Sequence, residues 1–191
     1  SMPMINHRGP EFKNLIFRLT DKLKSVFQTK NDLVILTASG SGCLEAAVVS
    51  TLSPGDRVLA ISIGAFGDRF ASIAKSYGAD VTTLDVEWGT PADPDQIRQA
   101  LSKDTKYKAV LVTHNETSTG VTNDLEAISN VVKMEFDKLL LVDAVSSLGC
   151  LPLPVDQWHC DVVATASQKG MMVPPGLGFV FFVRKHKTGR I

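Results

Sequence analysis

The amino-acid sequence predicts an α/β fold of three layers (α/β/α), in which helices cover both faces of a mostly parallel seven-stranded sheet whose last strand is antiparallel. Segments with helical and with strand-like patterns alternate along the 191 residues. Several strand-like segments are apolar almost throughout, which is typical of strands buried on both faces of a parallel sheet. The last connection, residues 168–177, is shorter than the crossover of about a dozen residues that parallel strands need, so it predicts the antiparallel strand.

The first element is an amphipathic helix over residues 12–27. Apolar side chains such as Phe12 and Leu15 recur there at steps of three and four residues, while Lys13 and Asp21 occupy the opposite face. The short apolar segments that follow are rich in β-branched residues, which favour strands. We predict strands over residues 33–38, 57–63, 80–87, 108–114, 138–144, 161–167 and 178–183.

Four further helices separate most of these strands. One begins behind Asp93, a residue type that caps helices, with Pro94 at the first helical position. We predict these helices over residues 42–52, 67–77, 94–102 and 123–134. The chain then divides into an N-terminal segment with its helix, residues 3–30, and one large domain, residues 31–191.

Composition limits the classes of partner. Twenty Lys and Arg residues balance twenty Asp and Glu residues, so no net positive field favours nucleic acid or an anionic membrane. No apolar run is long enough to cross a bilayer and no signal segment is recognised, so we expect a cytoplasmic protein. The cysteines lack the paired spacing of a metal site, and we expect no metal and three buried free thiols, Cys43, Cys150 and Cys160.

Chemically distinctive residues follow the predicted strands. In a parallel sheet the carboxyl ends of the strands share one edge, where ligands of open α/β sheets bind, so we expect these residues to lie together. Small hydroxylic residues at a helix N-terminus, as after the first strand, favour an anion such as phosphate. The residues are Ser39, Gly40 and Ser41 after the first strand, Phe66 after the second, the polar run 114–120 after the fourth, Asp143 and Val145 after the fifth, and Gln168 and Lys169 after the sixth.

The glycine–serine turn matches neither of two common phosphate-binding motifs. Gly40-x-Gly42 is followed by Glu45 where the dinucleotide fingerprint needs a third small residue, and no Walker A lysine follows. Each distinctive residue alone is more often structural. Together, a phosphate cradle, an aromatic ring, a carboxylate and a lysine suit pyridoxal 5′-phosphate, whose aldehyde condenses with a lysine amine.

Five segments resemble the class V aminotransferases of fold type I, specifically the alanine–glyoxylate and serine–glyoxylate (serine–pyruvate) branch. They occur in the order of that family and cover nearly the whole chain. Their sequences are "ASGSGCLEAAVVSTLSPGDRVL", "GAFGDR", "THNETSTGV", "LLLVDAVSSLG" and "TASQKGMMVPPG". The resemblance implies that residues 31–191 are the large, pyridoxal-phosphate-binding domain of a PLP-dependent transferase.

The resemblance also implies a role for each residue. Lys169 would form the Schiff base with the cofactor, and Asp143 would pair with the protonated ring nitrogen. The other implied contacts are phosphate binding by Ser39, Gly40, Ser41 and Gln168, ring stacking by Phe66 and Val145, and a hydrogen bond from Thr117 to the phenolic oxygen.

The implied reaction is transamination of a small amino acid, alanine or serine, with an oxo-acid, glyoxylate or pyruvate, by a homodimer. The chain ends soon after the seventh strand, where the family continues into a smaller C-terminal domain, so we expect that domain to be absent. The alternative is therefore a truncated, catalytically impaired cofactor-binding or dimerisation fragment. Cysteine desulfuration is disfavoured because no cysteine follows Lys169, and a nucleotide-binding oxidoreductase because the glycine pattern is broken.

Overall fold

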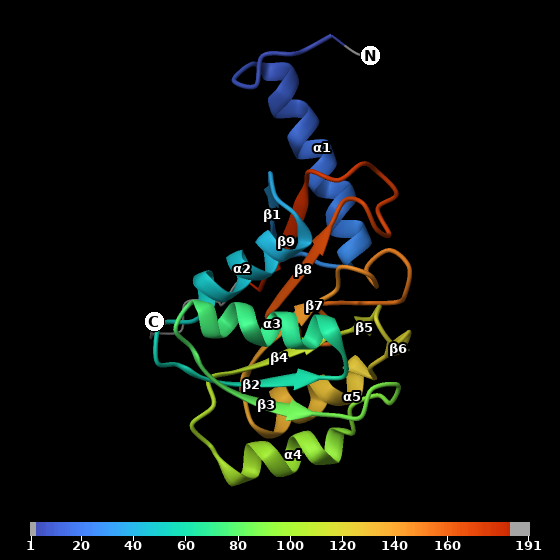
Figure 1. Cartoon of the computed structure of the whole chain (residues 1–191). Coiled ribbons are helices and arrows are strands. Elements are labelled where there is room, and N and C mark those ends of the chain that lie inside the picture. Colours follow the sequence, from blue (N-terminus) through green and yellow to red (C-terminus); the bar gives the residue numbers. More distant parts are fainter. Residues whose placement is uncertain (1–2, 184–191) are drawn as a thin grey trace.

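A seven-stranded sheet with helices on both faces forms the body of the computed structural model, which describes residues 3–183 (Figure 1). The strand order is β1-β9-β8-β7-β4-β2-β3. Neighbours from β8 to β3 are parallel, whereas β9 is antiparallel to both β8 and β1, so the predicted fold class is confirmed. The strands are β1 (Asp32–Leu36), β2 (Arg57–Ser62), β3 (Asp80–Asp85), β4 (Ala109–Thr113), β7 (Leu139–Asp143), β8 (Val162–Ala166) and β9 (Gly178–Phe182).

The helices match the predicted ones in number and order but differ at their ends. They are α1 (Pro10–Phe27), α2 (Gly40–Thr51), α3 (Ala65–Ser76), α4 (Pro94–Lys103) and α5 (Leu125–Ser129), which continues into a π-helical turn, η1 (Asn130–Glu135). The segment predicted as one helix over 123–134 therefore has two parts. Its wider π turn carries Lys133, whose ammonium group pairs with Asp161 at 2.7 Å and also donates to the Lys138 carbonyl.

Three helices, α1, α2 and α3, begin two residues earlier than the sequence pattern predicts, and two of these starts follow strands of the sheet. α2 starts at Gly40 rather than residue 42, because Ser39 Oγ accepts a hydrogen bond from Gly42 N and so caps the helix. α3 starts at Ala65 rather than residue 67, and no side chain of its own N-cap residue, Gly64, can cap it. Both starts lie at the carboxyl edge of the sheet, so the backbone there is helical rather than an open loop.

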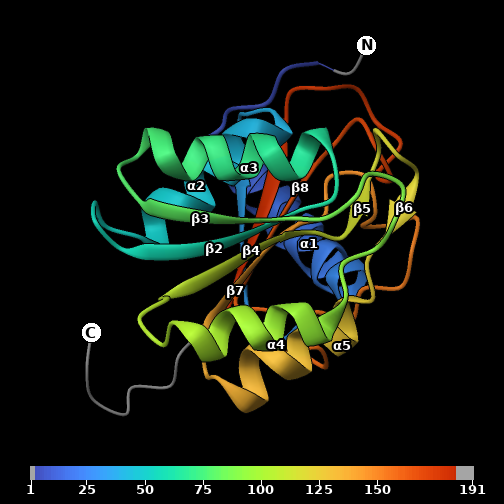
Figure 2. The same cartoon turned by 60° about the horizontal axis from the view of Figure 1, so that its bottom comes forward.

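The sheet separates two hydrophobic cores. Figure 2 shows α2 and α3 over one face of the sheet and α4 and α5 over the other. On the first face Leu44 and Phe70 pack with Leu111 of β4, and on the second Ile97 packs with Val112. Each such fully buried side chain stabilises the fold by about 1.5–3 kcal/mol relative to an exposed one. β4 and β8 are buried along their whole length, which explains why their sequences are apolar without alternation.

The polar run after β4 folds into a small hairpin that the sequence pattern did not predict. Its strands, β5 (Asn115–Glu116) and β6 (Val121–Thr122), are antiparallel. Buried Asn123 fixes the hairpin, because its side-chain amide donates to the Thr113 carbonyl at 2.8 Å and its oxygen accepts from Ala92 N. Side chains of this hairpin are therefore held in place at the carboxyl edge.

The cysteines differ in exposure. Cys43 and Cys160 are buried free thiols, and burial raises the pKa of Cys43 to about 11. Cys150 is exposed, so the prediction of a buried thiol is wrong for this residue. It follows Gly149, which has a φ of 85° in a surface turn, and a turn position offers no core to bury the thiol.

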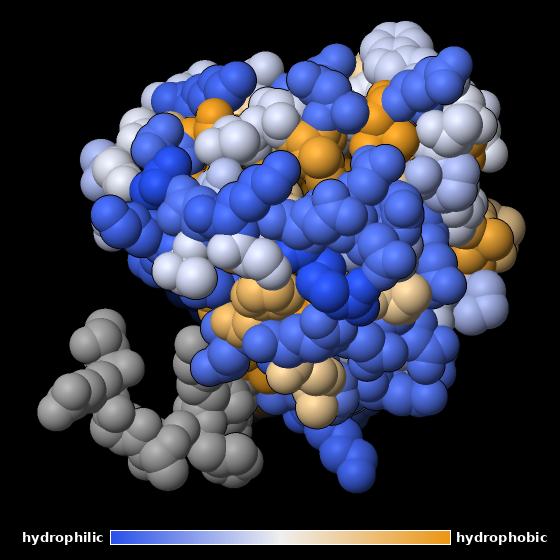
Figure 3. Space-filling model, turned by 90° about the horizontal axis from the view of Figure 1, so that it is seen from below, coloured by the Kyte–Doolittle hydropathy of each residue, from blue (hydrophilic) through white to orange (hydrophobic). Residues whose placement is uncertain are grey.

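The face seen from below, which includes α4, is mostly hydrophilic, with hydrophobic residues in small separate groups (Figure 3). Within residues 3–183, no helix combines the length and the apolar character needed to span a bilayer.

Candidate active site

A pocket lies at the carboxyl edge of the sheet, where β4, β7 and β8 end. It draws side chains from four separate segments of the chain. Its lining consists of Phe66 from α3, Asn115 and Thr117 from the hairpin after β4, Asp143, Val145 and Ser146 at the end of β7, and Lys169 after β8. Five of the nine predicted site residues thus line one pocket.

Asp143 is the acidic group of the pocket. It is the last residue of β7 and is only 3% exposed, between the parallel neighbours β4 and β8. Burial raises the pKa of its carboxyl group to about 6, and the hydrogen bond from Val145 N, 2.9 Å from Oδ1, partly offsets that effect. Nearby Glu116 raises the pKa and Arg69 lowers it. A buried carboxyl group with one protein donor suits a ligand that brings a second N–H donor.

Val145 takes its position from this hydrogen bond rather than from extended backbone. The bond from Val145 N closes a turn after β7, and the Val145 side chain still lines the pocket. On its other side Val145 meets the start of α2. A Cβ added at Gly40 would lie 2.8 Å from Val145 Cγ2, so only glycine allows α2 to approach this closely.

The start of α2 offers free hydrogen-bond donors beside the pocket. Among the residues that the structure describes, the backbone N–H groups of Gly40 and Ser41 have no acceptor, and the first turn carries no acidic residue. Ser39 Oγ is engaged as the helix cap. These residues do not line the pocket itself, but they border it through Gly40, and free N–H groups at a helix N-terminus favour an anion.

Phe66 is the second residue of α3, and its half-buried ring lines the pocket. The Arg69 guanidinium lies 5.3 Å from the centre of this ring, within the range of a cation–π contact. The Phe66 backbone N–H donates to Glu116 Oε2 at 3.0 Å. The buried Glu116 side chain therefore fixes the backbone from which the Phe66 ring projects.

Lys169 is exposed and stands in an anchored turn after β8. Fully buried Ser167 ties this turn to the fold, because its Oγ donates to the Pro174 carbonyl at 2.7 Å and its N–H donates to the Leu177 carbonyl. Gln168 is exposed beside Lys169 and does not line the pocket. Within residues 3–183 the Lys169 ammonium group forms no ion pair, so it is available to a ligand.

The free space between these side chains is about 20 Å³, room for a single water molecule. A flat ring therefore enters only when an accessible side chain turns aside. Lys169 is exposed and free to do so, whereas Asp143 is fixed by the sheet. With that movement, the residues present fit a ring with an attached phosphate: a carboxyl group, an aromatic side chain, a lysine amine and free helix N–H groups border one space.

Sequence reasoning missed three residues of this region. Asn115 and Ser146 line the pocket and bond to each other, with Asn115 Nδ2 donating to Ser146 Oγ at 3.0 Å. Glu116 lies fully buried behind the pocket. The polar run 114–120, which contains no apolar residue, was the available signal for two of them.

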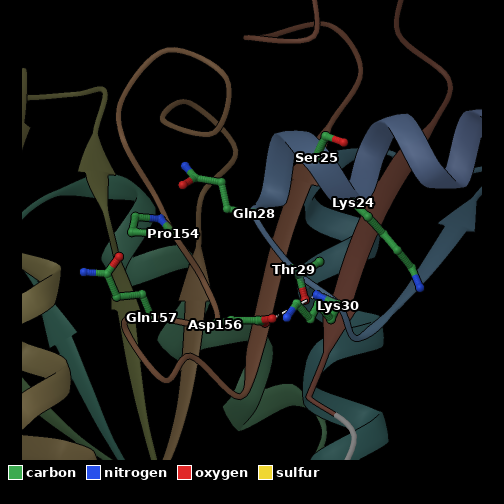
Figure 4. Close-up of a pocket in the computed structure, with 8 residues that line it drawn as sticks. All are labelled: Lys24, Ser25, Gln28, Thr29, Lys30, Pro154, Asp156 and Gln157. Carbon is green, nitrogen blue, oxygen red and sulfur yellow. Dashed lines mark hydrogen bonds between the residues drawn. The ribbon is translucent and has the colours of Figure 1, made fainter.

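A wider hollow of about 510 Å³ lies elsewhere, between the end of α1 and residues 154–157 (Figure 4). Its acidic residue, Asp156, accepts hydrogen bonds from Thr29 Oγ1, Lys30 N and Asn31 Nδ2. These bonds join the loop after α1 to the loop before β8, so Asp156 has a structural role there.

Comparisons with known proteins give one family model and relatives with different names. The family model described as aminotransferase class-V matches residues 2–189. Among curated proteins, the chain is 49% identical over 92% of its length to a soluble hydrogenase 42 kDa subunit of Anabaena cylindrica, covering 46% of that protein. It is 40% identical over 94% of its length to a serine–glyoxylate aminotransferase of Methylorubrum extorquens, again covering 46%.

Solved structures share the fold. A ureidoglycine–glyoxylate aminotransferase from Bacillus subtilis superimposes with a TM-score of 0.91 at 34% identity, over 95% of this chain and 47% of the other. The chain spans about half the length of the curated relatives that it matches.

Proposed function

The chain belongs to the class V aminotransferases, and from this membership we propose that it binds pyridoxal 5′-phosphate through a Lys169 Schiff base and serves transamination of alanine or serine with glyoxylate or pyruvate. The family depends on this cofactor. One observation carries the proposal: Lys169 and buried Asp143 line the same pocket, which borders the free N–H groups of α2. Two relatives are named as hydrogenase subunits, but a lysine amine beside a buried carboxyl group supports transamination instead.

When bound, the cofactor supplies an aldehyde carbon and a ring that withdraws electrons from the substrate. The Asp143 carboxyl group would accept the N–H of the ring nitrogen. A positive partner at that nitrogen offsets the burial that raises the pKa of Asp143, so the carboxylate and the protonated ring nitrogen stabilise each other.

Lys169 would hold the cofactor aldehyde through its amine, and its Nζ would carry the proton removed at the substrate α-carbon. Lysine suits both tasks because its amine is nucleophilic when neutral and acidic when protonated. The turn anchored by Ser167 keeps the backbone of Lys169 at the pocket while its side chain remains free to move.

The remaining site residues bind and orient. Gly40 N, Ser41 N and the Ser39 hydroxyl would hold the phosphate, with Gln168 supporting it from the lysine turn. Phe66 and Val145 would pack on opposite faces of the ring, and Thr117 would donate to its phenolic oxygen. These contacts would hold the ring in one orientation relative to Lys169.

Borohydride reduction tests the proposal. Adding pyridoxal phosphate to the protein is expected to give a visible absorption band, and reduction is expected to leave one stable adduct at Lys169, located by peptide mass spectrometry. Lys169→Ala removes the amine and is expected to abolish both signals. Lys75→Ala, which changes an exposed lysine of α3, is the matched control and should label as the wild type does. Labelling of the unaltered protein only at lysines other than Lys169 contradicts the proposal.

We further propose residues 31–191 as the cofactor-binding large domain, of which 184–191 lie outside the described residues, and a cytoplasmic homodimer as the working state. Sedimentation with and without pyridoxal phosphate tests the dimer, and fractionation of the source cells tests the location. Turnover of alanine or serine with glyoxylate separates an active enzyme from a binding fragment, which would label at Lys169 without forming product.

A further inference from the structure

Glu116 is a fully buried carboxylate that accepts hydrogen bonds from four donors. Its Oε2 accepts from Phe66 N at 3.0 Å and from Gly67 N at 3.1 Å. Its Oε1 accepts from Ser118 N at 3.1 Å and from Ser118 Oγ at 2.6 Å. Such bonds satisfy a charge that would otherwise be costly to bury.

These bonds replace the missing cap of α3. The first residue of the helix also participates, because Ala65 N donates to Ser118 Oγ at 3.1 Å. Three consecutive backbone N–H groups of the first turn of α3 therefore donate hydrogen bonds to the side chains of Glu116 and Ser118. A negative charge at this position is stabilised by the helix dipole, and the helix start is fixed in return.

The contact between α3 and the hairpin leaves no room for a side chain at Gly64. A Cβ added at Gly64 would lie 2.6 Å from Glu116 Cγ and 2.7 Å from Glu116 Cδ. Only the absence of a side chain at Gly64 lets the carboxylate reach the helix N-terminus. The packing and the hydrogen bonds thus point to the same fixed geometry.

Glu116 links two segments that line the pocket. Phe66, on α3, lines one part of it, while Asn115 and Thr117, the sequence neighbours of Glu116, line another. We propose that Glu116 is a positioning residue that sets the Phe66 ring relative to the Thr117 side of the pocket, at the spacing that a pyridine ring needs. This inference rests on the proposed function, because it assigns the ring that the spacing serves.

Amide hydrogen exchange in the cofactor-free protein tests whether Glu116 fixes the start of α3. Glu116→Gln keeps the shape but removes the charge and presents an NH₂ group to backbone donors. Because a hydrogen bond to a charged group is stronger than a neutral one, exchange at Phe66 N and Gly67 N is expected to rise about tenfold. Asp93→Asn makes the same change from carboxylate to amide at the N-cap of α4, a helix that does not line the pocket, and should leave these two amides unchanged.

The affinity for pyridoxal phosphate tests whether the position that Glu116 gives to the Phe66 ring serves cofactor binding. Glu116→Gln is expected to raise the dissociation constant about tenfold, and Asp93→Asn to leave it unchanged. In a Phe66→Leu background, Glu116→Gln should have little further effect, because the ring that it positions is already missing. Faster exchange with unchanged affinity, or equal losses of affinity with and without Phe66, overturns the inference.

Two further arms complete the experiment. If the unaltered protein gives no reducible adduct at Lys169, the proposed function fails; if it labels but Glu116→Gln binds normally, only the positioning role fails. Should Glu116→Gln not fold, Ser118→Ala takes its place, since it removes the acceptor of Ala65 N and one donor to Glu116. Faster exchange at Ala65 together with weaker binding supports the inference, and wild-type values for either overturn it.

Discussion

At the scale of single residues, Asp143 costs stability in the cofactor-free protein. Burial raises the pKa of its carboxyl group to about 6, above the value of about 3.9 in an unfolded chain. Between these pH values the folded protein holds a proton that the unfolded chain has released. The contribution of Asp143 to stability therefore falls as the pH rises from about 4 to about 6, by on the order of 2–3 kcal/mol in total.

Replacing Asp143 by asparagine is expected to relieve this cost. Asparagine cannot ionise, and its Oδ1 can still accept the bond from Val145 N. The cofactor-free variant should melt above the wild type at pH 8 and close to it at pH 4, while its affinity for pyridoxal phosphate falls. Thermal melts from pH 4 to pH 8 measure the difference.

The protonation of a second buried group, His114, changes stability with pH in the opposite direction, and its effect must be separated from that of Asp143. Burial lowers the pKa of His114 to about 4, so its contribution to stability is lost as the pH falls from about 6.5 towards 4. Both proteins contain His114, and its effect cancels in the difference between them. Parallel melting profiles for wild type and Asp143→Asn would show that Asp143 carries no such cost.

At the scale of elements, one close contact sets the position of α2 and with it the phosphate cradle. A Cβ added at Gly178, the first residue of β9, would lie 2.0 Å from Cys43 Sγ of α2 and 3.4 Å from the Ser39 carbonyl oxygen. β9 and α2 are thus packed to the limit that glycine allows. The position of the free N–H groups of Gly40 and Ser41 depends on this contact.

Gly178→Ala is expected to lower the free energy of unfolding by about 1–3 kcal/mol, the usual cost of overpacking a core. Adding Cys43→Ala removes the sulfur and should restore most of the loss, although Cys43→Ala alone is mildly destabilising. Urea denaturation of the two single variants and the double variant measures this recovery. A double variant no more stable than Gly178→Ala would exclude the Cys43 contact as the cause.

The sequence predicts the elements better than it predicts the contacts between them. Local sequence pattern predicts the seven strands and three site residues, Phe66, Asp143 and Lys169. This is possible because each apolar run and the residues that follow it are neighbours in sequence. The polar run 114–120 marks Glu116 as a candidate, but its contacts cannot be predicted in this way. Its partners at Phe66 N and Gly67 N lie 50 and 49 residues away, and nothing in the local pattern pairs them. The small hairpin β5–β6 was missed for a related reason, since each of its strands is two residues long and only Val121 among these residues is apolar.

At the scale of the whole molecule, the pocket joins segments that are far apart in the chain. Its side chains come from α3, from the hairpin after β4 and from the ends of β7 and β8, and α2 borders it through Gly40. Unfolding separates all of these segments. A ligand held by all of them binds the folded chain alone, so it stabilises the entire fold rather than one element.

Pyridoxal phosphate is therefore expected to raise the melting temperature as its concentration rises. At about 100 times the dissociation constant the gain is about 2.7 kcal/mol, which for a chain of this size corresponds to roughly 5–10 °C. 4′-Deoxypyridoxine 5′-phosphate keeps the ring and the phosphate but lacks the aldehyde, so it should stabilise the wild type less than pyridoxal phosphate does. In Lys169→Ala the two compounds should stabilise equally, because neither can bond to the missing amine. A larger effect of pyridoxal phosphate that persists in Lys169→Ala would mean that its aldehyde reacts elsewhere, and the assignment of Lys169 would then be wrong.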